Sequence, residues 1–180
     1  MITVLAGTNR EGSRTKLIAD YIYGLLVEQA EEEVQFFSLL DLPDDMVHTK
    51  MYSEDGQSKA LAEIQDEYMV AANKFYIVLP EYNGGAAGIF KLFIDACSVR
   101  KYNETFKGGK KAALTGVSAG RGGCSRGMEY MTGYLSYLGI HILPNRLPVS
   151  NIEQLVKEDE LIDEGTQRAI QQQVIEFLEF

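Results

Sequence analysis

The residues best suited to bind a ligand stand directly after the first apolar run, in the segment Gly7-Thr8-Asn9-Arg10-Glu11-Gly12-Ser13-Arg14-Thr15. The run Ile2–Ala6 before it predicts a strand, and the amphipathic stretch from Lys16 predicts a helix. A helix N-terminus presents unpaired N–H groups and the positive end of the helix dipole. Hydroxyls and an arginine at such a place are typical of a phosphate cradle. The alternative is a capped helix flanked by solvated arginines.

A phosphate monoester fits this segment better than a triphosphate. Gly7 and Gly12 have the separation of the Walker A motif, G-x-x-x-x-G. Ser13 and Arg14 then stand where that motif requires lysine and a hydroxyl residue, so the usual ligands of the γ-phosphate and of magnesium are missing. The segment also lacks the G-x-G-x-x-G fingerprint of dinucleotide sites. These differences disfavour an NTPase.

Two further loops are rich in glycine and poor in bulky side chains. In Pro80–Gly88, Pro80 ends an apolar run, while Asn83 and the glycines allow positive φ. The second loop is Ser118–Cys124. Either loop could bring its main chain against a flat heteroaromatic ring, or could simply be a turn. Nothing near Cys124 in the sequence indicates an activated thiol, so we assign it no redox role.

Strands and helices that alternate along the chain must position these loops. Apolar runs that suit strands covered on both faces are Ile2–Ala6, Val34–Leu39, Phe75–Leu79, Lys111–Val117 and Ile140–Leu143. Apolar residues at helical spacing follow each of these runs. The pattern predicts an α/β fold with a doubly wound five-stranded parallel sheet between two helix layers. The flavodoxin-like order 2-1-3-4-5 would place the carboxyl ends of strands one and three, and thus a ligand, at the switch point.

The remaining segments are predicted from their composition. Residues 41–57, rich in Asp, Pro and Gly, indicate a surface excursion, and residues 150–165 indicate a polar connection to the last helix. The 180 residues predict one domain. The formal charge of −9 disfavours a nucleic-acid partner. No apolar run is long enough for a membrane span, and we expect no secretory signal, because no basic region precedes the first apolar run.

The cysteines and histidines indicate a reducing environment without a metal site. Cys97 and Cys124 do not form a close pair, which favours a cytoplasmic protein over a disulfide scaffold. His48 and His141 lie far apart in the sequence, and no cluster has the spacing of metal ligands. We therefore expect a cytoplasmic protein without bound metal.

Taken together, the three loops resemble those of the NADPH-dependent FMN reductase family, whose fold is flavodoxin-like. The first loop of that family runs roughly G-S-x-R-x-x-S-x-N, and the chain has GTNREGSRT at residues 7–15. The second, P-E-Y-N-G-S-x-P-G-x-L-K-N-x-I-D, is similar to PEYNGGAAGIFKLFID at residues 80–95. The third, G-x-S-x-G, is matched by GVSAG at residues 116–120. The likeness runs from residue 2 to about residue 149, and the P-E-Y-N-G segment is its most specific part.

The resemblance implies a single flavodoxin-like FMN-binding domain over residues 1–180. The residues implied at the 5′-phosphate are Thr8, Arg10, Ser13 and Thr15, and Arg14 is also implied to bind the cofactor. The residues implied at the isoalloxazine are Pro80, Glu81, Tyr82, Asn83 and Gly84, with Ser118, Ala119 and Gly120 at its pyrimidine end. No catalytic side chain is assigned, because the flavin carries the chemistry in such enzymes.

The activity implied by the resemblance is that of an FMN-dependent NAD(P)H oxidoreductase. It passes hydride from NADPH or NADH to bound FMN and on to a quinone, flavin, azo compound or metal oxyanion. The alternative is a flavodoxin-type one-electron carrier; such carriers resemble T-x-T-G-x-T in the first loop and lack an arginine at the place of Arg10. An open flavin face further predicts a homodimer or homotetramer, with apolar residues of the third and fourth helices at the contact. The sequence does not indicate the physiological acceptor, the preference for NADPH or NADH, or whether FMN remains bound through turnover.

Overall fold

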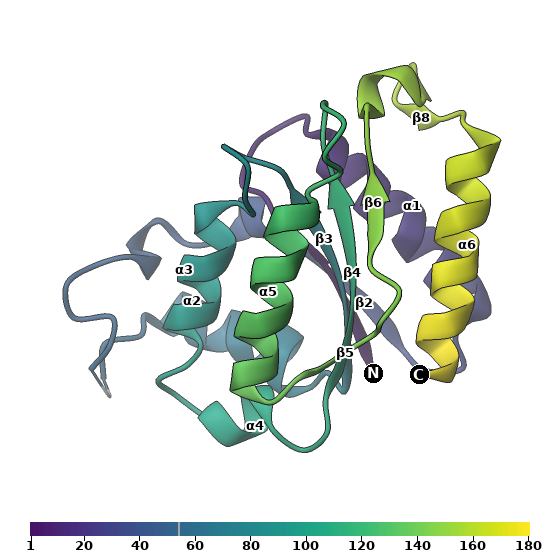
Figure 1. Cartoon of the computed structure of the whole chain (residues 1–180). Coiled ribbons are helices and arrows are strands. Elements are labelled where there is room, and N and C mark those ends of the chain that lie inside the picture. Colours follow the sequence, from purple (N-terminus) through teal and green to yellow (C-terminus); the bar gives the residue numbers. More distant parts are fainter. Residues whose placement is uncertain (54) are drawn as a thin grey trace.

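The computed structural model describes residues 1–53 and 55–180, and at its centre lies a parallel sheet with helices on both faces (Figure 1). Its strands are β1 (Ile2–Ala6), β2 (Val34–Ser38), β3 (Lys74–Pro80), β4 (Lys111–Val117), β5 (His141–Ile142) and β6 (Leu147–Val149). The order is β2-β1-β3-β4-β5, and β6 also pairs with β4. The predicted flavodoxin-like order is thereby confirmed, with its switch point between β1 and β3.

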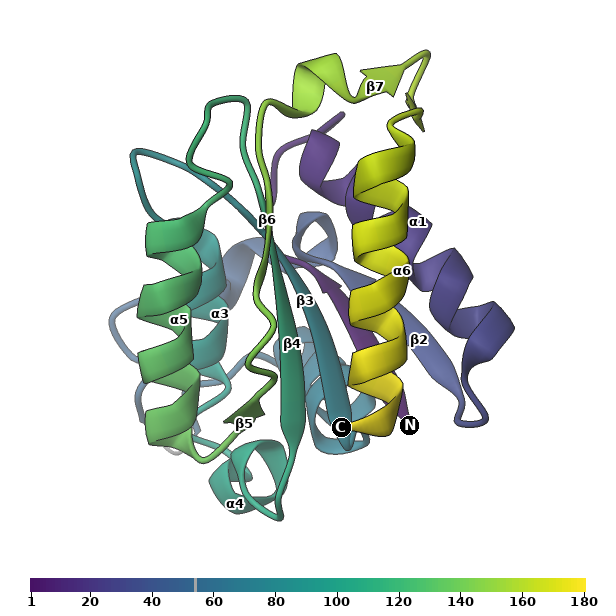
Figure 2. The ribbon, with the colours of Figure 1, turned by 45° about the vertical axis from the view of Figure 1, so that its right-hand side comes forward.

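Two helix layers enclose the sheet (Figure 2). One layer consists of α1 (Arg14–Gln29) and α6 (Glu164–Glu179); the other contains α2 (Lys59–Ile64), the π-helical segment η3 (Gln65–Val70), α3 (Gly88–Ala96), α4 (Tyr102–Phe106) and α5 (Ser125–Leu138). A hydrophobic core lies on each face of the sheet, and alternate residues of β3 pack into one or the other. Ile77 packs against the α3/α5 layer, whereas Val78 packs against the α1/α6 layer. Burial on both faces explains why the central strands are apolar throughout. Within the described residues, no helix is both long and apolar enough to cross a membrane.

The outer edge of the sheet differs from the prediction of a single fifth strand over Ile140–Leu143. It consists of two short strands, β5 and β6, which pair with successive parts of β4. The residues between them, 143–146, include Pro144, which has no N–H to donate to a ladder. β6 reaches the carboxyl end of β4, with Val149 beside Val117, and so brings the next segment to the ligand-binding edge.

Helix α6 is held on the sheet by a buried polar network as well as by apolar packing. The side-chain amide of Gln173 donates to the carbonyl of Leu114 at 3.1 Å and to that of Asn145 at 2.7 Å. Its Oε1 accepts from Thr115 Oγ1 at 2.6 Å and from the hydroxyl of Tyr76. Both the nitrogen and the oxygen of this buried amide have hydrogen-bond partners. The network therefore fixes the rotation of α6 relative to β4.

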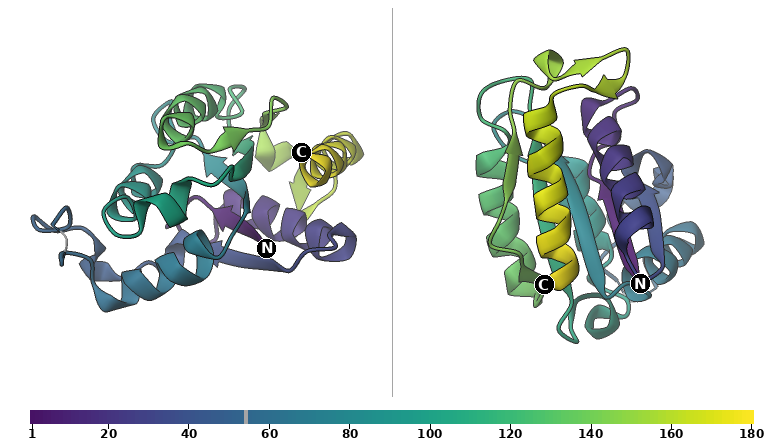
Figure 3. Two further views of the ribbon diagram at one scale, coloured as in Figure 1. Left: turned by 90° about the horizontal axis from the view of Figure 1, so that it is seen from below. Right: turned by 90° about the vertical axis from the view of Figure 1, so that its right-hand side faces the viewer.

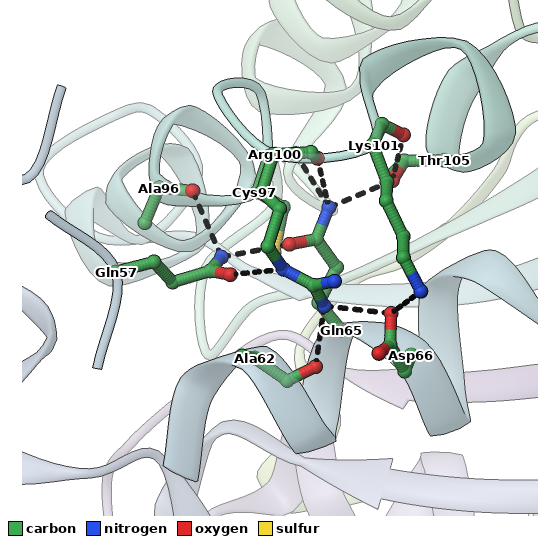
Figure 4. A network of polar contacts seen from close by, with 9 residues as sticks. All are labelled: Gln57, Ala62, Gln65, Asp66, Ala96, Cys97, Arg100, Lys101 and Thr105. Atoms are coloured by element: carbon green, nitrogen blue, oxygen red, sulfur yellow. Dashed lines mark hydrogen bonds and ion pairs between the residues drawn. The ribbon is translucent and has the colours of Figure 1, made fainter. Parts of the chain in front are cut away.

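A second network, shown in Figure 4, anchors the end of the excursion predicted at residues 41–57. Gln57 donates to Oε1 of buried Gln65 at 2.7 Å and accepts from Nε of Arg100 at 2.7 Å. Arg100 also donates to Asp66 at 2.6 Å and to the carbonyl of Ala62 at 2.7 Å. The excursion is thus tied to η3 and to the segment after α3. One of its residues, Glu54, lies outside the described part of the chain.

Candidate functional site

The three loops singled out in the sequence meet at the carboxyl end of the sheet, after β1, β3 and β4 (Figures 1 and 2). A cavity of about 460 Å³ opens between them. The predicted site residues that line it are Arg10, Ser13, Arg14, Thr15, Pro80, Glu81, Tyr82, Ser118 and Ala119. Thr8, Asn83, Gly84 and Gly120 belong to the same loops without lining the cavity. Residues not predicted that also line it are Gly12, Val117, Ile152, Glu153 and Asp159.

A larger hollow, of about 560 Å³, lies along the first turns of α1 and faces the chain near Leu161. It contains no residue of the loops after β3 and β4. We therefore place the candidate site in the smaller cavity, which sits at the switch point where ligands of open α/β sheets bind.

The first loop ends in a capped helix. Ser13 is the N-cap of α1, and its hydroxyl accepts from the N–H of Lys16 at 3.2 Å. The N–H groups of Arg14 and Thr15, in the first helical turn, have no acceptor among the described residues. The side chain of Arg10 is exposed at the cavity and forms no ion pair within residues 1–53 and 55–180. A free cation beside free N–H groups suits an anion.

Thr8 connects the first two loops. Its side chain is completely buried, and its Oγ1 lies 2.6 Å from the hydroxyl of Tyr82. The same oxygen accepts from the N–H of Arg10 at 3.1 Å. Thr8 therefore joins the first two loops and fixes the backbone at Arg10, although it does not line the cavity.

The second loop contains a tight turn at its tip. Asn83 and Gly84 have φ of 53° and 78°, the pattern of a type I′ turn. Tyr82 and Gly85, on either side, exchange hydrogen bonds of 2.8 and 3.1 Å. The Asn-Gly pair in the sequence explains this turn, because both residue types tolerate positive φ. The turn leaves the main chain at Pro80 and Glu81 on the cavity wall.

The third loop is organised by Ser118 and by a carboxylate from the second loop. The hydroxyl of Ser118 donates to the carbonyl of Gly120 at 2.8 Å and accepts from the N–H of Gly123 at 2.8 Å. Glu81 Oε2 accepts from the N–H of Cys124 at 2.9 Å. A Cβ on Gly122 would lie 2.8 Å from that same carboxylate oxygen, so only glycine allows this approach without adjustment. The Glu81 contact therefore holds the second and third loops together.

Cys124 is a structural residue of this arrangement. It is buried, and its thiol donates to the carbonyl of Pro80 at 3.2 Å. Burial, together with the nearby carboxylate of Glu81, raises the pKa of the thiol to about 11. Burial also raises the pKa of Cys97. Both thiols are consequently protonated at neutral pH, which does not favour redox chemistry at either position.

The segment predicted as a polar connection at residues 150–165 instead forms a wall of the cavity. It contains the short helix η4 (Ile152–Gln154) and a hairpin of β7 (Val156–Lys157) and β8 (Glu160–Leu161). Figure 3 shows this chain crossing from β6 to the N-terminal end of α1. There Arg14 donates to Asp159 at 2.6 Å and to Glu153 at 3.2 Å. These hydrogen bonds, first to Asp159 and then to Glu153, raise the pKa of Arg14.

The sheet order and the cavity at its switch point define a flavodoxin-like α/β protein with a ligand site at the carboxyl ends of its strands. The model of the NADPH-dependent FMN reductase family matches residues 1–154, and the chain belongs to this family. It is therefore an oxidoreductase that uses FMN as cofactor and NAD(P)H as co-substrate. Membership in this family favours the reductase over the flavodoxin-type carrier.

Relatives and a solved structure agree with this assignment. The NAD(P)H-dependent FMN reductase of Pseudomonas aeruginosa is 28% identical over 172 residues, covering 94% of this chain and 89% of that protein. The 2-hydroxy-1,4-benzoquinone reductase of a Burkholderia species is 26% identical over 180 residues, covering 94% and 90%. The structure of FerB, a flavoenzyme NAD(P)H:(acceptor) oxidoreductase from Paracoccus denitrificans, matches with a TM-score of 0.78 at 21% identity, over 99% of this chain and 94% of that one.

Proposed function

We propose that the cavity between the three loops is the FMN site of this reductase. Arg10, Ser13 and Thr15, with the N–H groups that begin α1, would hold the 5′-phosphate. The observation that supports this proposal is the exposed guanidinium of Arg10, which has no ion-pair partner among the described residues and lies beside the N-terminus of α1 on one cavity wall. A phosphate there would satisfy the cation and the helix N–H groups together.

The opposite walls fit a flat ring. The main chain at Pro80–Gly84 and at Ser118–Gly120 would border the isoalloxazine, with little side chain in the way. The N–H groups of Ala119 and Gly120 have no acceptor among the described residues, so they are available to oxygen or nitrogen atoms at the edge of a ring. Thr8 and Glu81 would act indirectly, because their side chains tie the loops to one another.

When bound, FMN supplies the redox chemistry, taking hydride from NAD(P)H and passing it on to an acceptor. The protein would contribute position and electrostatics: its loops would orient the ring, and the main-chain donor at Ala119, which lines the cavity, would stabilise negative charge that develops on the ring. The described cavity walls offer no histidine or cysteine side chain as a general acid. We therefore assign no catalytic side chain.

The proposed acceptor is a small molecule of the quinone class. The Burkholderia relative, which is named a 2-hydroxy-1,4-benzoquinone reductase, supports this proposal through its coverage of 94% of the chain. The test is NADPH oxidation by the FMN-loaded protein with a benzoquinone, an azo dye or free FMN as the second substrate. The proposal requires the highest kcat/KM with the quinone; a preference for either other acceptor would contradict it.

We further propose a cytoplasmic homodimer or homotetramer built from one domain over residues 1–180. The apolar stripes of α3 and α5 are buried against the sheet, so a partner would meet the exposed tyrosines of α5, Tyr130 and Tyr137, whose exposed fractions are 55% and 83%. The unbridged Cys97 and Cys124 suit a reducing compartment. Light scattering at micromolar concentration tests the assembly, and a monomeric mass would contradict it.

A further inference from the structure

The guanidinium of Arg14 forms ion pairs with two carboxylates of the later chain. Its Nη1 lies 2.6 Å from Asp159 Oδ1, and its Nε lies 3.2 Å from Glu153 Oε2. Both carboxylates line the same cavity as Arg10 and Ser13. A cation implied to bind the cofactor is thus engaged by two anions from the segment 150–161, which we call the C-terminal strap.

The strap is fixed at its root by hydrogen bonds to the third loop. The N–H of Asn151 donates to the carbonyl of Gly120 at 2.8 Å, and the N–H of Ile152 donates to that of Ser118 at 3.0 Å. The hydroxyl of Ser150 donates to the carbonyl of Arg121 at 2.9 Å. The strap therefore spans the cavity from the loop proposed at the flavin ring to the loop proposed at the phosphate (Figure 3).

The tip of the strap is an exposed turn that brings a carboxylate to Arg14. Glu158 and Asp159 form the turn between β7 and β8, with φ of 50° and 61°, the pattern of a type I′ turn. Aspartate tolerates this left-handed region, whereas it is unfavourable for glutamate. The exposed fraction of the Asp159 side chain is 87%, so packing does not hold it beside Arg14.

We propose that Glu153 and Asp159 are specificity-determining residues that divert Arg14 from the phosphate of FMN and so weaken the retention of the phosphorylated cofactor. This inference rests on the proposed position of the phosphate at Arg10 and the start of α1. Two carboxylates repel a phosphate dianion in the same cavity, and each also competes with it for the guanidinium. The strap thereby makes FMN exchangeable, while the phosphate loop alone would hold it more tightly.

The test is a comparison of FMN and riboflavin binding by quenching of flavin fluorescence. The variant Glu153→Gln/Asp159→Asn keeps the size of both side chains and removes their charges. We expect it to bind FMN about five- to tenfold more tightly than the wild type, with riboflavin affinity unchanged, because riboflavin carries no phosphate. Glu160→Gln, on the same hairpin but without a contact to Arg14 in the described residues, is the matched control and should change neither affinity.

Unchanged or weaker FMN binding by the double variant would overturn the inference, since the carboxylates would then hold the loop rather than compete for Arg14. Adding Arg14→Gln to the double variant should reduce the gain to the part that comes from relieved repulsion; a gain of undiminished size would show that freed Arg14 does not contribute to it. The affinities of the wild type for FMN and riboflavin distinguish the proposed phosphate site from the proposed role of the strap. Equal affinity for FMN and riboflavin would contradict the phosphate site itself, whereas a preference for FMN that the double variant leaves unchanged would contradict only the role of the strap.

Discussion

The hydroxyl of Tyr82 lies 2.6 Å from Oγ1 of Thr8, and this hydrogen bond joins the loop after β3 to the loop after β1. Thr8 in turn accepts from the N–H of Arg10. The residue proposed to bind phosphate and the turn proposed to border the flavin ring are therefore coupled through one buried threonine. The geometry of either end of the cavity depends on the other.

Replacing Tyr82 with phenylalanine tests this coupling. The change removes one hydrogen bond and keeps the ring, so FMN affinity should fall by about 0.5–1.5 kcal/mol, or roughly two- to tenfold. Tyr137→Phe is the matched control, because its side chain is 83% exposed and lies on α5. Flavin fluorescence titration measures both. Equal affinities of the Tyr82 variant and the wild type would show that the hydrogen bond does not position the site.

Gly116, in β4 beneath the third loop, should not tolerate a side chain. A Cβ there would lie 2.2 Å from the carbonyl oxygen of Gly123 and 2.8 Å from Cβ of Cys124. Gly116→Ala should lower the free energy of unfolding by about 2–3 kcal/mol, because the loop backbone must shift. Gly24 lies on the exposed side of α1, and no atom of the described residues lies within 4 Å of the place that a Cβ would take. Gly24→Ala should therefore raise the free energy of unfolding by about 0.5–1 kcal/mol. Urea denaturation measures both, and a Gly116 variant as stable as the wild type would contradict the packing described.

The cysteines should be inert in the folded protein. With its pKa raised to about 11, Cys124 is a thiolate in only about one molecule in a thousand at pH 8, and burial restricts reagents further. Ellman's reagent at pH 8 should therefore react slowly with the native protein and with both thiols after unfolding in guanidinium. Rapid reaction of one thiol under native conditions would mean that Cys124 or Cys97 is more accessible than its burial implies.

Lys110 should make stability depend on pH in the alkaline range. Its ammonium is buried against the carbonyls of Met69 and Val70, at 2.7 and 3.0 Å, and burial lowers its pKa from 10.5 to about 8. The native state therefore binds fewer protons than the unfolded chain between about pH 8 and 10.5. The cost of burying the charge is fully present below pH 8 and disappears as the pH rises through 10.5.

The comparison with Lys110→Met isolates this effect. Since methionine does not ionise, the stability of the wild type relative to the variant should improve by about 1–2 kcal/mol between pH 7.5 and 10.5, after allowance for solvent screening. Urea denaturation at several pH values measures the difference. A difference that stays constant over this range would show that the pKa of Lys110 is not lowered.

Much of the fold could be predicted because local patterns determine it. The strand Ile2–Ala6 is found with the predicted bounds, since an apolar run ends at Gly7. The outer strand predicted over Ile140–Leu143 is found, but only His141 and Ile142 pair with the start of β4. The second edge strand was missed, because the chain leaves the sheet and rejoins it at Leu147. No pattern of apolar residues in that segment indicates where the chain leaves the sheet and where it rejoins it.

The candidate site could be predicted at its loops but not at its long-range contacts. Glycines, hydroxyls and Arg10 mark the cavity in the sequence, and the position of the loops follows from the strand order. The partners of Arg14 lie 139 and 145 residues further along the chain, and Tyr82 lies 74 residues from Thr8. The sequence of the strap offers one weak signal: in Val156–Leu161 the central residues, Glu158 and Asp159, are polar, which suits the turn of a short hairpin.

The most direct test of the proposed site is a titration of Arg10→Ala with FMN and with riboflavin, beside the wild type and the control Arg168→Ala. Arg168 is also an exposed arginine, but it lies on α6 and pairs with Glu164. We predict that the wild type and the control bind FMN at one site per chain, that Arg10→Ala binds it about tenfold more weakly or worse, and that riboflavin affinity is the same in all three. A wild type that takes up no FMN, or an Arg10 variant that binds FMN as tightly as the wild type, would contradict the proposed site.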